Sequence, residues 1–281
     1  MILLSVGSMR FFGIDRVFGI ACDLGFDGVE LIVDERWDTA DPVYLKRLMD
    51  RYGLPIVSVH SPFSFVETHG WGSDPVERMR QSVCLAEACG SEIVVFHLPF
   101  FAERRYATWM EKELPLWQEK TNVRLAVENM PCAYKILGRL GVILKMGSFY
   151  EVNRHTWFNR LLLPLSKPCF IGNDWDSLNR FKYLVLDTTH LATGGLDPVQ
   201  AYERMKSRLA LIHVSNFTET EHQPLGVGRI DMAGFLRHVA SDGYQGHVTI
   251  ELMPDHFPDR TEATARKIIA ADLELCRSCL K

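Results

Sequence analysis

The stretch EIVVFHLPF, residues 92–100, is a short apolar run that ends in an imidazole. Ile93 to Phe96 are apolar and mostly β-branched, which is typical of a strand that is buried on both faces. His97 follows directly, and Pro99 closes the run. The pattern predicts a buried strand that carries a polar side chain at its end, and the same pattern recurs along the chain.

Eight runs of this kind are present, and amphipathic helical segments separate most of them. The runs are ILLSVG, GVELIV, PIVSVH, EIVVFH, RLAVEN, YLVLDT, LALIHV and HVTIEL. Helical periodicity predicts helices over 12–24, 42–52, 75–88, 104–120, 198–207, 232–241 and 260–280. Three of these helices follow an Asp-Pro pair, which suits a helix N-terminus, at Asp41, Asp74 and Asp197. Four end at a glycine, as helix C-termini often do, at Gly25, Gly53, Gly90 and Gly243.

Strands that are apolar on both faces and alternate with helices favour parallel pairing, with helices covering the sheet. Eight such units in 281 residues predict a single (β/α)8 TIM barrel that spans residues 1–281. The alternative is an open, doubly wound sheet. That fold usually has a glycine-rich first turn, but SVGSMRFFG does not match GxGxxG, and no GxxxxGK[ST] motif occurs.

The fifth connection between strands is longer than its neighbours. Glu128 and Asp187 mark the fifth and sixth strand ends and are 59 positions apart, whereas the preceding strand ends are 30 to 37 apart. The excess predicts an insertion over residues 131–170, which is rich in basic and aromatic side chains. Two interpretations remain open: a lid over the barrel mouth that contacts substrate, or an insertion that is structural or contacts another subunit.

The composition is that of an ordinary globular protein and narrows the range of partners. The net charge is −4 and 23% of the residues are charged, so no overall excess of positive charge indicates binding to nucleic acid or to an anionic membrane. The seven cysteines are scattered, which predicts reduced thiols and a cytoplasmic location. Cys276 and Cys279 are expected to be helix residues and not a redox pair. No run approaches the roughly 18 apolar residues of a membrane span, and the N-terminus does not resemble a signal peptide.

The ends of the predicted strands carry an unusual set of polar side chains. In such a barrel the C-terminal strand ends meet at one rim, where active sites lie. Seven of the eight strands deliver histidine or carboxylate side chains there, and two more histidines follow closely: Glu30, His60, His97, Glu128, Asp187, His213 and Glu251, then His190 and His222. Converging buried carboxylates repel one another, so the set predicts a divalent cation. Mixed imidazole and carboxylate ligands suit Zn²⁺, Mn²⁺, Fe²⁺ or Co²⁺, as one ion or two.

The motifs around these residues resemble the xylose isomerase-like barrel superfamily. They are FDGVEL, VSVHSP, VVFHLP, AVENMP, LVLDTTH, LIHVSN, EHQPLGVGRID and VTIEL, and they follow the order of the family from about residue 25 to 255. That group contains sugar and sugar-phosphate isomerases and epimerases, and also the endonuclease IV type of abasic-site nuclease, AP endonuclease family 2.

The resemblance implies roles for individual residues. Glu128, Asp187, His213 and Glu251 would form the main metal site, and Glu128 and Glu251 would also transfer protons. His60 and His97 would hold a second metal that Glu128 bridges. His190 would bind substrate or a further metal, and His222, which matches a histidine common to both branches of the family, would bind substrate. Apart from the resemblance, Glu30 is expected from its place at the rim to help orient substrate. One departure stands out: Thr220 occupies the position where the nuclease has an aspartate that binds a third metal.

Three functions remain open at this point. The leading hypothesis is a metal-dependent sugar or sugar-phosphate isomerase or epimerase, in which a base removes a proton beside a carbonyl and a cation stabilises the enediolate. The second is an endonuclease IV-like phosphodiesterase that acts on abasic-site DNA. The third is a barrel that binds metal or sugar without catalysis. We expect a small carbohydrate partner and no membrane partner, and the sequence is compatible with a homo-oligomer.

Overall fold

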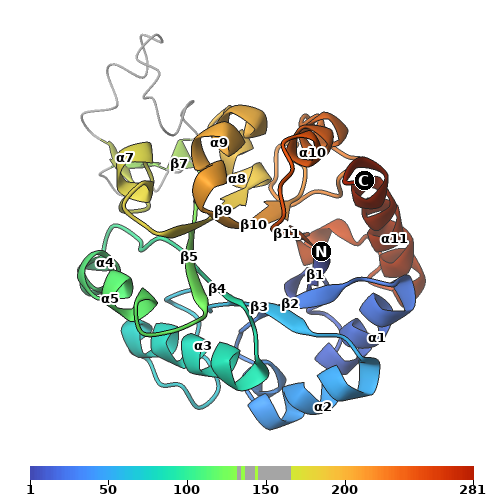
Figure 1. Cartoon of the computed structure of the whole chain (residues 1–281), viewed down its shortest axis with the longest axis horizontal. Helices are drawn as coiled ribbons and strands as arrows, with labels where there is room; N and C mark the ends of the chain where they lie inside the picture. The colour runs from blue at the N-terminus through green and yellow to red at the C-terminus, as the bar shows by residue number, and fades with distance from the viewer. Residues whose placement is uncertain (132–133, 137–142, 145–165) are drawn as a thin grey trace.

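The computed structural model describes residues 1–131, 134–136, 143–144 and 166–281, and its centre is a closed barrel of eight parallel strands (Figure 1). The strands are β1 (Ile2–Ser5), β2 (Gly28–Ile32), β3 (Ile56–His60), β4 (Ile93–Phe96), β5 (Arg124–Glu128), β9 (Tyr183–Asp187), β10 (Leu209–Val214) and β11 (His247–Ile250). Their order around the barrel is β1-β11-β10-β9-β5-β4-β3-β2. The predicted TIM barrel is confirmed, with a strand at each of the eight predicted runs.

Helices surround the barrel (Figure 1). They are α1 (Ile14–Leu24), α2 (Pro42–Tyr52), α3 (Pro75–Cys89), α4 (Arg104–Lys112), α5 (Leu114–Gln118), α7 (Trp175–Leu178), α8 (Thr188–Thr193), α9 (Pro198–Met205), α10 (Met232–Ser241) and α11 (Glu262–Cys279). Most predicted bounds agree within two residues. The single helix predicted over 104–120 is wrong: it is divided at Glu113, because Pro115 in the first turn of α5 has no N–H to continue the hydrogen bonding of α4.

The connection from β5 to β9 is extended, as predicted. Its described part includes a three-stranded antiparallel sheet in the order β7-β6-β8, formed by β6 (Tyr134–Ile136), β7 (Ile143–Leu144) and β8 (Ser166–Pro168). Most of the predicted insertion, including the basic and aromatic side chains in which it is rich, lies outside the described residues. Its role as a lid therefore stays a prediction.

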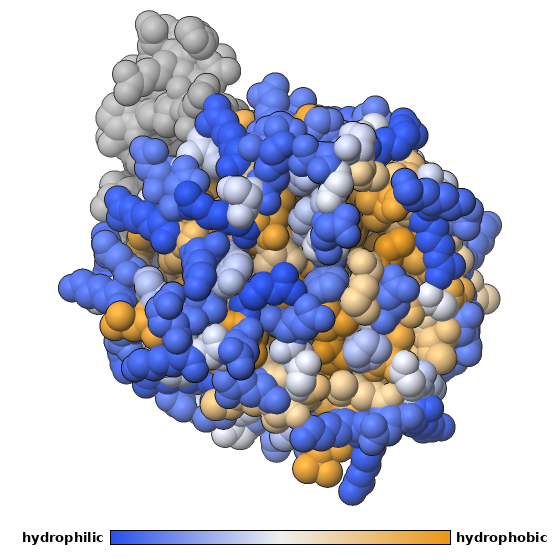
Figure 2. Space-filling model, in the orientation of Figure 1, coloured by the Kyte–Doolittle hydropathy of each residue, from blue (hydrophilic) through white to orange (hydrophobic). Residues whose placement is uncertain are grey.

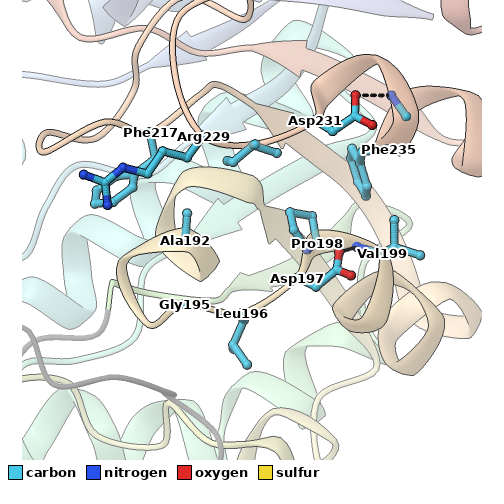
Figure 3. Close-up of a pocket in the computed structure, with 12 residues that line it drawn as sticks. Ala192, Gly195, Leu196, Asp197, Pro198, Val199, Phe217, Arg229, Asp231 and Phe235 are labelled. Carbon is cyan, nitrogen blue, oxygen red and sulfur yellow. Dashed lines mark hydrogen bonds between the residues drawn. The ribbon is translucent and has the colours of Figure 1, made fainter.

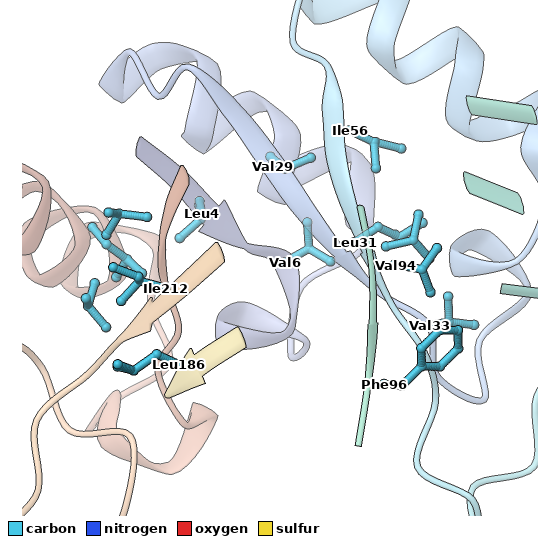
Figure 4. Packing of buried hydrophobic residues seen from close by; sticks show 14 of the residues in the cluster. Leu4, Val6, Val29, Leu31, Val33, Ile56, Val94, Phe96, Leu186 and Ile212 are labelled. Atoms are coloured by element: carbon cyan, nitrogen blue, oxygen red, sulfur yellow. The ribbon is translucent and has the colours of Figure 1, made fainter. Parts of the chain in front are cut away.

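Two apolar layers form on the strands because successive side chains point to opposite faces. The inner layer contains strand residues alone: Leu3, Val57, Ile93, Val95, Ala126, Val185, Ala210 and Leu211, with Tyr183 against them. The outer layer packs against the helices and includes Leu4, Val29, Leu31, Val94, Phe96, Leu186 and Ile212 (Figure 4). A polar side chain two positions beyond an inner residue therefore points into the barrel, as Glu128 does after Ala126.

A bulge in β3 changes which side chains enter the barrel. Val29 pairs with Ile56, but Glu30 pairs with Ser58, so Val57 is an extra residue in β3. Val57 belongs to the inner layer and Val59 to the outer one. Without the bulge, Val59 and not His60 would follow Val57 inward. The bulge therefore turns His60 toward the barrel axis.

Hydrophilic residues cover most of the face shown in Figure 2, with apolar residues in the hollows between them. No helix in the described part of the chain is long and apolar enough to cross a membrane. Cys276 and Cys279 are free thiols buried on α11, as expected of residues one turn apart on a helix.

Candidate metal centre

His213 lies at the centre of the rim and is completely buried. The strand register places it beside Asp187 of β9 and Thr249 of β11. Its Nδ1 atom lies 3.0 Å from Glu251 Oε2, 3.2 Å from Glu128 Oε1 and 3.9 Å from Asp187 Oδ2. Three carboxylates from three different strands therefore converge on one imidazole nitrogen.

The contact made by the other ring nitrogen of His213, Nε2, determines the tautomer of the ring and so whether Nδ1 carries a hydrogen. Nε2 lies 3.1 Å from Glu30 Oε2, which also accepts a 2.8 Å hydrogen bond from Ser58 Oγ. Because Glu30 can only accept when ionised, Nε2 carries the hydrogen, and in the neutral ring Nδ1 presents a lone pair to the three carboxylates. Such an arrangement requires a proton or a cation at Nδ1. In the ion-free protein burial opposes the charge, but the charges of Glu30, Glu251 and Glu128 raise the pKa of His213 well above its usual value.

Two further histidines contact the other carboxylate oxygen of Glu128, Oε2. His60 Nε2 and His97 Nε2 each lie 3.2 Å from Glu128 Oε2. His60 Nδ1 donates to the carbonyl oxygen of Ser61 at 2.9 Å, so the lone pair of its neutral ring also faces a carboxylate. Burial opposes a charge on His60, but the hydrogen bond and charge of Glu128 raise its pKa to about 9. Burial and the neighbouring His60 charge lower the pKa of His97 to about 4.

The two carboxylate oxygens of Glu128 thus face two different sets of histidines. Oε1 faces His213 and also lies 3.4 Å from His190 Nδ1, whereas Oε2 faces His60 and His97. Burial alone would raise the pKa of Glu128, but His213 and the other imidazoles hold it well below its usual value. Within the described part of the chain, Glu128 has no lysine or arginine as an ion-pair partner.

The donor atoms fit a divalent cation. One ligand atom each from Glu128, Asp187, His213 and Glu251 lies within 4.8 Å of every other, and the same holds for His60, His97 and Glu128. The buried Asp187 Oδ2 has no hydrogen-bond partner among the described residues, so its lone pairs are available to coordinate a cation. Both groups combine imidazole with carboxylate, the donor set of Zn²⁺, Mn²⁺, Fe²⁺ and Co²⁺.

His190 and His222 form the outer edge of the centre. Asp187 caps α8 and accepts a 2.8 Å hydrogen bond from the His190 backbone N–H. His190 Nδ1 donates to the Asn129 carbonyl oxygen at 2.8 Å. The His222 ring is perpendicular to the His190 ring, with centroids 5.2 Å apart. With Asp187 these two histidines make a third group of ligand atoms within 4.8 Å of one another, so they can serve a further ion or a substrate oxygen.

Several residues that hold these side chains in place were not predicted from sequence. Asn129 accepts from Asp187 N at 2.8 Å and donates to Asp187 O at 3.2 Å, which ties the end of β5 to the end of β9. Thr189 Oγ1 accepts from His222 N at 3.2 Å and donates to Asn216 O at 3.1 Å. The only available sequence signal was position, because Asn129 and Thr189 stand within the motifs AVENMP and LVLDTTH.

The loop that carries His222 is also fastened from the outer helix α11. Asp272 is buried on that helix and accepts a 3.0 Å hydrogen bond from Leu225 N. Burial raises the pKa of Asp272 to about 7. His222 itself has a φ of 55°, a left-handed conformation that side-chain-bearing residues adopt only when their surroundings impose it. Tertiary contacts therefore determine where His222 lies.

Glu30 makes contacts that the sequence did not predict. It is completely buried and contacts Ser58 and His213. These contacts favour a role in fixing the tautomer and orientation of the His213 ring, as carboxylates often do for metal-binding histidines. A direct contact between Glu30 and substrate stays untested.

A cavity of about 530 Å³ opens between the loop that joins α8 to α9 and the start of α10 (Figure 3). Its two carboxylates are engaged as helix caps: Asp197 accepts from Val199 N and Asp231 from Gly234 N, each at 2.9 Å. None of the predicted site residues lines this cavity. We therefore place the chemistry at the buried imidazole–carboxylate cluster.

The sequence matches the family described as xylose isomerase-like TIM barrel over residues 18–149 and 180–279. It is also similar to an uncharacterised protein of Mycobacterium leprae, with 29% identity over 283 residues that cover 99% of this chain and 96% of the relative.

Two solved structures show the similarity of fold. D-psicose 3-epimerase with D-tagatose from Clostridium cellulolyticum H10 superposes with a TM-score of 0.66 at 14% identity, covering 100% of this chain and 99% of that one. An AP endonuclease, family 2, from Brucella melitensis superposes with a TM-score of 0.63 at 14% identity, covering 96% of this chain and 97% of that one. At these identities the likeness concerns the fold alone.

Proposed function

Because the chain belongs to the xylose isomerase-like TIM barrel family, we propose that it is a divalent-metal-dependent isomerase or epimerase of sugars or sugar phosphates. The observation that carries this proposal is the convergence of Glu128, Asp187 and Glu251 on His213 Nδ1 at the barrel rim. These four residues would hold the cation. When bound, it supplies Lewis-acid stabilisation of the negative charge that develops on substrate oxygens as a proton leaves the adjacent carbon.

The two glutamates assigned to proton transfer differ in their surroundings. Glu128 is fully buried and both its oxygens contact imidazoles, whereas 12% of the Glu251 side chain is exposed. Burial disfavours the charge on Glu251, but His213 holds its pKa below the usual range, so Glu251 is in the ionised form that a general base requires. Glu251 is therefore the better candidate for the base, and Glu128 the better candidate for a shared ligand.

The position of β11 supports a two-sided arrangement. β11 and β5 are separated by β10 and β9 in the barrel, so Glu251 and Glu128 flank Asp187 and His213 from two sides. A substrate bound over His213 would meet Glu251 on one flank and His190 and His222 at the outer edge. The imidazoles at that edge can donate hydrogen bonds to sugar hydroxyls or to a phosphate.

The proposal is tested by proton exchange, which does not require the product to be known. The protein loaded in turn with Mn²⁺, Co²⁺ and Zn²⁺ is incubated in D₂O with aldoses, ketoses and their phosphates, and deuterium at the carbon next to the carbonyl is measured by NMR. We expect exchange with at least one sugar and a loss of roughly 10²- to 10⁴-fold in Glu251→Gln, the range for a general base.

Glu274→Gln is the matched control, since Glu274 is exposed on α11. Its exchange rate should equal that of the unaltered protein. Exchange that persists unchanged in Glu251→Gln would show that another group is the base. Metal binding without exchange in any sugar would favour a barrel that binds without catalysis.

A second function is favoured by one specific observation, the pair His60 and His97 on Glu128 Oε2. A second ion there would give two cations sharing one carboxylate, an arrangement common in phosphoester hydrolysis. Incision of abasic-site DNA at varied metal concentration tests this alternative. Cleavage that His60→Gln abolishes would establish it, and absence of both cleavage and salt-dependent DNA binding would eliminate it.

A further inference from the structure

A row of aromatic rings leads outward from the metal centre. The His60 and His97 rings meet with centroids 4.5 Å apart, and the Phe63 ring lies 4.2 Å from that of His97. Phe63 stacks on Phe65 at 5.3 Å with an interplanar angle of 25°. Phe65 then meets Phe100 at 5.7 Å. The loop after β3 and the loop after β4 thus extend the ligand cluster with apolar rings.

Two of these rings are open to solvent. Phe63 is 39% exposed and Phe65 is 66% exposed, whereas Phe96, Phe170 and Phe257 are buried. Neighbouring exposed aromatic side chains are unfavourable for a soluble protein unless something covers them. His97, which lies next to Phe63, is only 8% exposed, and its Nδ1 has no hydrogen-bond partner among the described residues. The stacked pair therefore begins at the metal centre and ends in solvent.

The loop that carries the pair is held firmly. Arg78 of α3 is 3% exposed, and its guanidinium donates to the carbonyl oxygens of Ser64, Val66 and Ser73. Val66 N also donates to Phe63 O at 2.9 Å, which closes a turn around the pair. A buried guanidinium that binds three carbonyls of one loop fixes that loop, since releasing it would leave a buried charge unpaired. The exposed rings are thus presented on a rigid support.

We propose that Phe63 and Phe65 form an aromatic platform, a binding subsite for a planar, uncharged ring on the same small molecule whose polar portion reaches the metal centre. The proposal rests on the proposed function in one respect, that the polar portion is a carbohydrate. Phenylalanine offers no polar atom, so the ring that it binds presents an apolar face. Contact between Phe63 and His97 places that ring directly beside the metal ligands. The substrate class is a sugar that bears an aryl or similarly flat apolar substituent.

Binding of matched glycosides tests the platform without requiring turnover. Phenyl and methyl glycosides of several sugars are titrated calorimetrically into the metal-loaded protein. Both members of a pair are locked at the anomeric carbon, so failure of the isomerase proposal does not affect the result. We expect the phenyl member to bind roughly three- to tenfold more tightly, the contribution of one aromatic pair. Equal affinities in every pair, or no binding by any glycoside, would overturn the proposal.

Phe65→Ala is the decisive variant, because Phe65 stacks on Phe63 and packs at a tilt against Phe100, whereas the ring contact with His97 is made by Phe63. It should remove most of the preference for phenyl over methyl while metal content stays unchanged. Leu116→Ala, at another exposed apolar residue of 61% exposure, is the matched control and should retain the preference.

Two other outcomes would assign the platform to a different partner and so overturn the proposal. One is a dimer in analytical ultracentrifugation that Phe65→Ala converts to a monomer. The other is salt-dependent binding of abasic-site DNA that Phe65→Ala weakens while the glycoside pairs bind equally.

Discussion

The two ends of the barrel both carry histidine–carboxylate contacts, but their charges are balanced in opposite ways. At the N-terminal end, Glu92 lies 3.1 Å from His247 Nε2 and 2.7 Å from Arg124, and its side chain is 53% exposed. At the C-terminal end, Glu128 is completely buried, and its ion-pair partners among the described residues are all imidazoles. Arg124 neutralises Glu92, which is also half exposed to solvent, whereas Glu128 is buried and has no arginine partner in the described part of the chain.

This difference bears on whether each carboxylate needs a ligand. A permanent cation such as arginine satisfies a carboxylate without further partners, so the contact near His247 needs no ligand. At the C-terminal end the imidazoles can neutralise the carboxylates only when protonated, and a divalent cation would replace those protons. The absence of arginine around Glu128 among the described residues is thus stronger evidence for a metal site than the presence of histidine.

If the two ends of the barrel differ as described, Glu128→Gln at the C-terminal end should have the largest effect on metal content and turnover. The amide removes the negative charge from both oxygens that face the imidazoles, so the cation should lose its shared ligand. We expect metal content to fall to background and turnover to fall by roughly 10²- to 10⁴-fold. Atomic emission on purified protein and the proton-exchange assay measure this. Full metal occupancy in the variant would contradict the shared-ligand assignment.

A smaller effect is expected when the support of His213 is altered. Glu30→Gln keeps the shape of the side chain but weakens acceptance from His213 Nε2, so metal affinity should fall by about 10- to 100-fold, as for other groups that orient a metal-binding histidine. A chelator-competition titration gives the value. If affinity is retained and only KM rises, Glu30 touches substrate, as the sequence had suggested.

Proton release upon metal binding sharpens the comparison further. Because the pKa of His60 is raised to about 9, it is protonated near neutral pH and must lose that proton to become a ligand. At pH 7.5 we expect His60→Gln to release about one proton fewer on metal binding, measured by calorimetry in buffers of different ionisation enthalpy. His247→Gln should leave proton release unchanged.

The raised pKa of His60 also makes the stability of the protein without metal depend on pH. The folded-state pKa of His60 exceeds its unfolded value of 6.5, so its stabilising contribution is complete below pH 6.5 and is lost as pH rises through 9. Thermal unfolding of chelator-treated protein should therefore show a lower Tm at pH 9.5 than at pH 6.5. This decrease should be smaller in His60→Gln.

The smallest effect is expected at the N-terminal end. Glu92→Gln weakens contacts with Arg124 and His247 at a carboxylate that is 53% exposed, so stability should change by less than about 1 kcal/mol. Metal content and turnover should equal those of the unaltered protein. A loss of metal in this variant would show that the two ends are coupled, and the contrast drawn between them would fail.

Most of the fold was predictable because its determinants are local. Strand apolarity, Asp-Pro pairs and terminal glycines repeat along the chain, and the structure contains a strand at each predicted run. The break between α4 and α5 was missed because the apolar pattern of 104–120 continues through Pro115. The small sheet of β6, β7 and β8 was missed because its strands are two or three residues long and too short to show a period.

The candidate site was predicted residue by residue, but its internal organisation was not. His60, His97, Glu128, Asp187, His213 and Glu251 do converge, because parallel strands of one barrel end at the same rim. Glu30 contacts His213 Nε2, which the sequence did not predict, and its contact with substrate stays a prediction. Asn129, Thr189 and Asp272 hold the site through hydrogen bonds to distant segments, and no local pattern marks them.

By itself, the sequence determined the barrel, the rim and the kinds of ligand atoms gathered there, since periodicity and strand-end chemistry depend on neighbours along the chain. Only the tertiary structure decided the rest. The register between β2 and β3 places the bulge that turns His60 inward, and closure of the barrel brings Glu30 behind His213. Pairing between strands far apart in the chain also decides that Glu128 presents one oxygen to His213 and the other to His60 and His97. These choices depend on distances across the barrel, which no stretch of sequence contains.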